Sequence, residues 1–161
     1  MDSNYSKNPY CTDIPSLSDL KNYIGKELGL SKWTKITQTQ INSFANTTDD
    51  RQWIHIDPER CQKQSPYKKP IAHGFLVLSL ASKFCYEAYQ LRNASMGINY
   101  GLDKVRFINA VEVNSFIRGR VSLISSEEIE NGVKYKLNIV FELKNQKKPA
   151  CIAEFIAIAY Y

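Results

Sequence analysis

The residues best suited to chemistry in this 161-residue chain are its two histidines and one acid that precedes the first of them. In the segment DDRQWIH, Asp50 lies five positions before His55, and the second histidine, His73, lies directly before Gly74. An imidazole has an unperturbed pKa near ~6.5, so with a carboxylate it could activate a water molecule and move a proton. The alternative is structural, with Asp50 as a cap or turn residue and His55 as a packed ring bonded to a backbone carbonyl.

Composition narrows the class of protein. A chain of 161 residues fits one domain with a sizeable core, and 43% hydrophobic with 23% charged residues is typical of a folded soluble protein. No apolar run is long enough to span a bilayer, so we expect no membrane partner. The first ten residues, MDSNYSKNPY, lack the layout of a secretory signal, and we therefore expect a cytoplasmic protein.

The net charge of +5 is spread along the chain without a long basic block. Since no arginine-rich helix or aromatic RNA-binding signature accompanies it, we expect no nucleic-acid partner. The positive balance also suits an anionic small molecule that carries phosphates, although a solvated lysine-rich surface explains it equally simply. The four scattered cysteines form no C-x-x-C pair, so we expect free thiols rather than disulfides or a zinc site.

The first half of the chain predicts short elements around the acid and the first histidine. We expect residues 1–15 to form a flexible N-terminal arm and residues 16–161 to form the single domain. Apolar residues at roughly helical spacing predict a helix in SLSDLKNYIGKELGLS (16–31), and WTKIT (33–37) is a strand candidate. Thr37 with Gln40 predicts a capping box at the start of the next helix, and Asp57 with the proline after it predicts the cap of another.

The segment AHGFLVLSLASKFCYEAYQL (72–91) is apolar or small on almost every side, which predicts a helix buried nearly all round. In VKYKLNIVFELK (133–144), by contrast, apolar residues alternate with polar ones, as in a strand with one buried face. Asn131-Gly132 predicts the hairpin turn that joins it to the preceding strand. The last segment, ACIAEFIAIAYY (150–161), predicts a strand covered on both faces. We therefore expect an α+β fold, in which a curved antiparallel sheet wraps around one long buried central helix.

Three motifs in order resemble one known family. GKELGLSKWTKITQTQINSFANTTDDRQWIHIDPERC (25–61), KKPIAHGFLVLSLAS (68–82) and NYGLDKVRF (99–107) are similar to the MaoC-like hydratases of the hot-dog fold, in the branch related to nodulation protein N. The resemblance runs from about residue 20 to residue 120. It implies a homodimer and (R)-specific hydration of a 2-enoyl thioester, or the reverse dehydration, without a metal or redox cofactor. Coenzyme A or an acyl carrier protein would enter only as part of the substrate.

The resemblance also implies roles for individual residues. The Asp and His of the family motif fall on Asp50 and His55, its His-Gly falls on His73 and Gly74, and its serine falls on Ser82. Hydration of an unsaturated thioester needs a base for the water, an acid for the α-carbon and donors for the enolate oxygen. The backbone N–H of Gly74, at the start of a buried helix, is suited to hold that oxygen. His73 is expected to have a structural role at the helix entrance.

Other positions allow two interpretations each. Asn99 and Tyr100 resemble a segment near the family's pocket, or they belong to a strand-entry turn. Lys68 and Lys69, with Lys63, could contact the phosphates of coenzyme A, or they are only solvated. Asp49 replaces the glycine of the broader family motif; if a positive φ is needed there, aspartate adopts it less easily, and its charge could raise the pKa of Asp50.

Two further functions compete with the hydratase. Hot-dog folds also host thioesterases, although these usually lack the Asp-x4-His arrangement. A binding module for acyl-CoA or an acyl carrier protein that kept the pocket and lost turnover is the second, and Asp49 is the residue that favours it.

Overall fold

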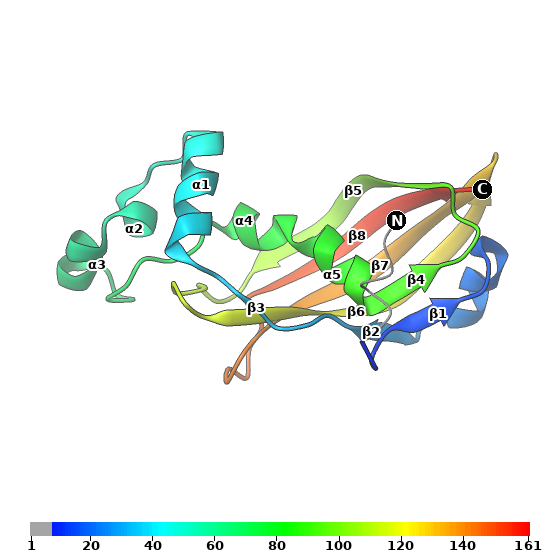
Figure 1. Cartoon of the computed structure of the whole chain (residues 1–161), viewed down its shortest axis with the longest axis horizontal. Coiled ribbons are helices and arrows are strands. Elements are labelled where there is room, and N and C mark those ends of the chain that lie inside the picture. The colour runs from blue at the N-terminus through cyan, green and yellow to red at the C-terminus, as the bar shows by residue number, and fades with distance from the viewer. Residues whose placement is uncertain (1–7) are drawn as a thin grey trace.

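The computed structural model describes residues 8–161. The first half holds short elements, and the second half holds four long strands (Figure 1). In chain order the elements are β1 (Thr12–Ile14), η2 (Leu17–Tyr23), β2 (Glu27–Leu30), β3 (Thr34–Lys35), α1 (Gln38–Thr48), α2 (Trp53–Ile56), α3 (Pro58–Gln64), α4 (Gly74–Ser79), α5 (Ala81–Ala88), β4 (Tyr89–Leu91), β5 (Met96–Phe107), β6 (Phe116–Ile129), β7 (Gly132–Leu143) and β8 (Cys151–Tyr160).

The main sheet is antiparallel with strand order β2-β6-β7-β8-β5, and β3 also pairs with β6. The predicted hairpin is present, but its turn residues are Glu130 and Asn131 rather than Asn131 and Gly132: Asn131 has φ 59°, and Ile129 pairs with Gly132, the first residue of β7. The predicted alternation in β7 is confirmed as well, because its apolar residues other than Val140 are buried and its polar residues are half-buried. The expectation for the last strand is wrong, since β8 alternates too and one face of it is only half-buried.

A central helix covers the buried face of the sheet, as expected, but it consists of two segments (Figure 1). Leu80 ends α4 and begins α5, and the chain leaves the helix at Ala88 to form β4. Phe84 of α5 is fully buried and packs against Phe141 of β7 with 5.7 Å between ring centroids. The expectation of a helix buried nearly all round is wrong for the side that carries Phe75 and Tyr86, which are 69% and 60% exposed.

The predicted N-terminal features differ from the structure in two ways. Leu17–Tyr23 is a 3₁₀ helix, and Glu27–Leu30 is a strand rather than the end of a helix. The arm predicted for residues 1–15 is wrong for Thr12–Ile14, because this strand pairs in parallel with β4 and its Ile14 is fully buried in the core. Residues 1–7, the rest of that prediction, lie outside the described residues.

The helices α1, α2 and α3 lie together beyond one end of the sheet (Figure 1). The predicted capping box is present at the start of α1, where Gln40 N–H donates to the Thr37 side chain and Thr37 N–H donates to the Gln40 side chain. Asp57 caps α3 through the Arg60 N–H, as predicted. The chain that joins α1 to α3 carries Asp50 and His55.

Thiol chemistry finds no support in the described part of the chain. The four cysteines are free, as expected. Burial raises the pKa of Cys85 to about 12 and that of Cys151 to about 11, so both stay protonated near neutral pH. No helix among residues 8–161 has both the length and the hydropathy that crossing a membrane would require.

Candidate active site

The site begins where α1 ends. Asp49 is the C-cap residue of α1 and has φ 60° and ψ 14°, the left-handed conformation that glycine adopts most easily. Its carboxylate is exposed and pairs with Arg51 at 2.9 Å, so it is directed to solvent and neutralised there. The position does take a positive φ, and aspartate adopts it here. This turn reverses the chain and brings Asp50 toward the start of the central helix.

His55 lies on α2 and is buried, with 6% of its surface exposed. Its Nδ1 is 2.6 Å from the carbonyl oxygen of Ile71, and a carbonyl can only accept, so Nδ1 carries the proton and donates it. The neutral ring then has a lone pair on Nε2. The main-chain carbonyl of His55 accepts a hydrogen bond from Gln38 of α1 at 2.8 Å, which ties α2 to α1. His55 therefore has a second ring nitrogen, Nε2, whose lone pair can accept a proton.

His73 joins the two predicted catalytic residues. Its ring stacks on that of His55 with 3.7 Å between centroids and 26° between planes. Its Nε2 lies 2.9 Å from the main-chain oxygen of Asp50 and 4.0 Å from the Asp50 carboxylate. His73 is also the N-cap residue of α4, so the predicted place at the helix entrance is confirmed. Asp50, His55 and His73 therefore form one cluster.

The pKa of His55 is lowered from its ordinary value, first because the ring is buried and second because His73 lies beside it. The hydrogen bond with Ile71 and the charge of Asp50 act in the opposite direction. The net result favours the neutral imidazole, which is the form that can accept a proton from water.

A cavity of about 260 Å³ opens beside this cluster, and both His55 and Gly74 line it. Gly74 begins α4, and His73 makes no side-chain capping bond there, so no capping side chain occupies the first-turn N–H groups. A Cβ on Gly74 would lie 3.1 Å from three carbons of the Phe107 ring. Glycine therefore lets Phe107 and the helix start approach each other at the cavity wall. The other lining residues are Tyr67, Ile71, Ala72, Val77, Ile108, Asn109, Ala110, Val111 and Ala150.

Ser82 does not join this cluster. Its hydroxyl accepts a hydrogen bond from Asn99 at 2.9 Å, and with Asn99 and Tyr100 it lines a second cavity of about 260 Å³ between α5 and β5. The resemblance implies a place for Ser82 in this site, but in the structure Ser82 lies on α5, beyond the junction of the two helix segments at Leu80, and bonds to Asn99. Asn99 and Tyr100 lie within β5 rather than in a turn, and Lys134 lies 5.5 Å from the Tyr100 ring.

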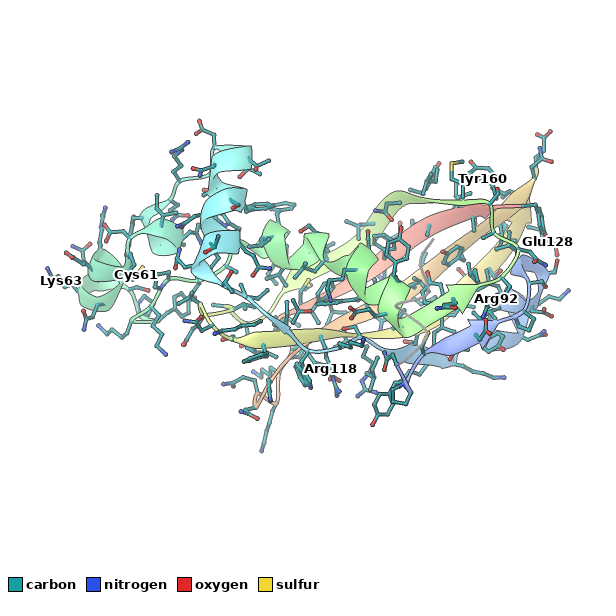
Figure 2. All side chains as sticks on the ribbon, viewed as in Figure 1. Cys61, Lys63, Arg92, Arg118, Glu128 and Tyr160 are labelled. Atoms are coloured by element: carbon teal, nitrogen blue, oxygen red, sulfur yellow. The ribbon has the colours of Figure 1, made fainter. Side chains whose placement is uncertain are left out.

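The lysines proposed for coenzyme A lie outside the first cavity. Lys68 is exposed with φ 60°, and Lys69 pairs with Glu112 at 3.5 Å. Figure 2 places Lys63 at the outer end of α3, away from the sheet. Tyr67, which directly precedes Lys68, lines the cavity instead. The sequence did not predict that Tyr67, Phe107 and Asn109 line the cavity, because only the fold brings these distant segments together.

The same cluster is also the place to consider a metal ion. One potential ligand atom from each of Asp50, His55 and His73 lies within 4.8 Å of the others. Each imidazole, however, gives one nitrogen to a backbone carbonyl, and the two rings stack face to face. Ring nitrogens coordinate in the plane of the ring, so stacked rings converge poorly on one ion. The donor set fits acid–base chemistry better than it fits a tetrahedral metal site.

Known proteins match both the sequence and the fold. The chain is 43% identical over 148 residues to nodulation protein N of Rhizobium meliloti, which covers 91% of this chain and 92% of that protein. It is 42% identical over 142 residues to 3-hydroxyacyl-thioester dehydratase Z of Mycobacterium tuberculosis, covering 88% and 93%.

Solved structures confirm the hot-dog fold. The R-hydratase PhaJ1 from Pseudomonas aeruginosa superposes with a TM-score of 0.69 at 19% identity, over 93% of this chain and 88% of that chain. A monoamine oxidase regulatory protein from Archaeoglobus fulgius superposes with a TM-score of 0.74 at 21% identity, over 94% and 97%. The family model described as MaoC like domain matches residues 19–142. The chain therefore belongs to the MaoC-like family.

Proposed function

We propose that this protein adds water to a 2-enoyl thioester, or removes it from a 3-hydroxyacyl thioester, with Asp50 and His55 activating the water. Family membership and the dehydratase relative give the general reaction class: the chain is a hydro-lyase of acyl thioesters. The observation that best supports Asp50 and His55 as the groups that activate the water is the position of His55. Its proton is held on Nδ1 by Ile71, and its ring lines the cavity that Gly74 also lines.

The chemistry follows from these atoms. The Asp50 carboxylate accepts one hydrogen bond from a water molecule, and His55 Nε2 takes the other proton as the water oxygen bonds to the β-carbon. The electron pair of the double bond moves toward the thioester carbonyl, whose developing negative charge the Gly74 N–H stabilises. The protonated His55 then returns the proton to the α-carbon, and the product is a 3-hydroxyacyl thioester.

This mechanism uses no metal ion and no redox cofactor, and coenzyme A or an acyl carrier protein enters as part of the substrate. The resemblance implies the (3R) product. A purified sample given crotonyl-CoA, with and without a chelator, tests both points. We expect loss of the conjugated absorbance, a (3R)-hydroxyacyl product on chiral chromatography, and equal rates with and without the chelator. A rate that collapses on chelation would instead make Asp50, His55 and His73 metal ligands.

The acid side of the pH profile tests the state of His55. Because burial lowers its pKa in the folded protein, the acid limb of kcat/KM should have its midpoint below the ordinary value near ~6.5. The depressed pKa also means that the unfolded chain binds the proton first, so His55 contributes stability above its unfolded pKa and loses that contribution as pH falls toward the folded one. Rate profiles and denaturant titrations measure the two effects. A midpoint well above the ordinary value would contradict this assignment of the base.

Asp49 should not limit activity, because its side chain faces solvent and pairs with Arg51. We expect Asp49→Gly to leave kcat within about twofold, since the left-handed turn that places Asp50 is kept. Relief of left-handed strain opposes the loss of an exposed ion pair and the added freedom of the unfolded chain, so the free energy of unfolding should change by less than about 1 kcal/mol. A gain of tenfold or more in kcat would show that Asp49 weakens the site, as the binding-module alternative requires.

The homodimer is part of the proposal, and the edge strand β5 supports it. Among residues 8–161, β5 is the edge strand of the main sheet and pairs with β8, so these residues leave its outer edge of backbone groups open. Large apolar side chains along it and near it are exposed, among them Met96, Tyr100, Leu102, Phe107 and Phe75. We expect light scattering after gel filtration to give twice the chain mass of 18.5 kDa. A monomer at micromolar concentration would contradict the dimer.

A further inference from the structure

His73 contacts several segments of the candidate site at once. Its ring stacks on His55, which lies eighteen residues earlier, and Nε2 binds the main chain of Asp50, twenty-three residues earlier. Phe44 of α1 packs against the same ring with 5.0 Å between centroids. The next residue, Gly74, begins α4 and supplies the proposed donor for the enolate. One buried ring thus contacts every segment that the reaction uses.

The protonation of His73 follows from its partners. A main-chain oxygen can only accept, so Nε2 carries the proton and donates it to Asp50. In the neutral ring Nδ1 is then a bare acceptor, and it is buried without a hydrogen-bond partner among the described residues. A buried acceptor without a partner is unfavourable, and a phenylalanine ring would fill this space without it. Packing alone therefore does not explain a histidine here, whereas the Nε2 donor does.

The bond to Asp50 matters because it is the shortest of the hydrogen bonds that the described residues make with Asp50. Within the described part of the chain, the Asp50 N–H donates to the Thr48 hydroxyl and the Gln52 N–H donates to the Asp50 carboxylate, each at 3.5 Å. The Asp50 side chain is 55% exposed, so packing restrains it weakly. The 2.9 Å hydrogen bond from His73 to the main-chain oxygen of Asp50 is shorter than both. It ties the carboxylate-bearing loop to a ring that is itself stacked on the base.

We propose that His73 is a positioning residue, which holds the Asp50 loop through Nε2 and the His55 ring through stacking. This inference rests on the proposed hydratase function. It assigns His73 a role in the rate of the reaction beyond its place at the helix entrance. A displacement of about 1 Å between a reacting group and its substrate can cost on the order of 10²-fold in rate.

A matched pair of variants tests the role of Nε2. The amide nitrogen of glutamine reaches as far from the backbone as Nε2, whereas that of asparagine reaches only as far as Nδ1. We expect His73→Gln to keep kcat within about fivefold of the wild type and His73→Asn to lower it by about 10- to 100-fold. In both variants KM should change by less than about threefold, because the substrate pocket is kept. Equal kcat values for the two variants would overturn the inference.

Two further measurements separate positioning from simple packing. His73→Phe keeps a ring but has no donor, so we expect it to match His73→Asn in kcat while its Tm equals or exceeds that of the wild type. Wild-type kcat in His73→Phe would overturn the inference. In an Asp50→Asn background, His73→Asn should cause no further loss, because the two act through the same loop. Fully additive losses would contradict this coupling.

The assay also separates this inference from the function on which it rests. If the wild type hydrates no enoyl thioester, the proposed function fails and this inference fails with it. If the wild type hydrates crotonyl-CoA and His73→Asn does so at the same rate, only the inference fails. If His73→Phe does not fold, the glutamine and asparagine pair still decides the matter, since both are uncharged amides that differ in reach.

Discussion

His55→Ala should lower kcat for hydration of crotonyl-CoA by at least about 10³-fold, because His55 is the proposed proton acceptor and donor. No other described side chain of the cluster offers a comparable base: the Nε2 of His73 is engaged with Asp50, and its Nδ1 is buried. KM should change little, since the imidazole acts on the water rather than on the acyl chain. Steady-state kinetics with purified protein measures both constants.

A second His55 variant controls for folding. Alanine also removes the buried bond to Ile71, and a carbonyl left without its donor costs about 1–3 kcal/mol of stability. His55→Asn places an amide nitrogen where Nδ1 lies, so it can still donate to Ile71 while the base is gone. We expect His55→Asn to be more stable than His55→Ala and equally inactive. Activity of His55→Asn within tenfold of the wild type would contradict the assignment of His55 as the base.

Asp50→Asn should also lower kcat by at least about 10³-fold, with little loss of stability. The change removes the charge that orients the water but keeps the size of the side chain. The hydrogen bond from His73 goes to the main chain of Asp50, so the variant leaves it in place. The side chain is half exposed, and its replacement should change the free energy of unfolding by less than about 1 kcal/mol.

The matched control for Asp50 is its neighbour. Asp49→Asn removes a negative charge one residue away, on a side chain that is 87% exposed. Asparagine adopts the left-handed conformation at least as easily as aspartate. We expect Asp49→Asn to keep wild-type kcat while Asp50→Asn loses it. Equal effects of the two variants would mean that local charge, rather than the Asp50 carboxylate itself, supports the reaction.

Local patterns predicted the parts of the fold that depend on local physics. The capping box at Thr37 and the hairpin turn at Asn131 are both present, because each depends on hydrogen bonds or backbone angles within a few residues. The pairing of Asp50 with His55 was predicted from their spacing and from the family motif. Their proximity to His73 arises because the left-handed turn at Asp49 and the stacking of the two rings bring distant segments together.

The predictions that failed depend on long-range packing. The resemblance to the family motif placed Ser82 in the site, but Ser82 lies beyond the junction of the two helix segments at Leu80 and bonds to Asn99. Thr12–Ile14 has a polar sequence around it, yet pairing with β4 and burial of Ile14 fix it to the domain. Periodicity within a segment cannot report which distant strand or helix will contact it. For the same reason, the sequence did not predict that Phe107 and Tyr67 line the cavity.

The most direct test of the account gives crotonyl-CoA to the wild type, Asp50→Asn and His55→Asn in parallel, and follows the conjugated absorbance together with a free-thiol reagent. If Asp50 and His55 are the catalytic pair, the conjugated absorbance of crotonyl-CoA should fall with the wild type alone, and no sample should release free thiol. Thiol release by the wild type would make the protein a thioesterase. Acyl-CoA binding by calorimetry without reaction across enoyl chain lengths would make it a binding module. Robust hydration by both variants would remove Asp50 and His55 from the mechanism.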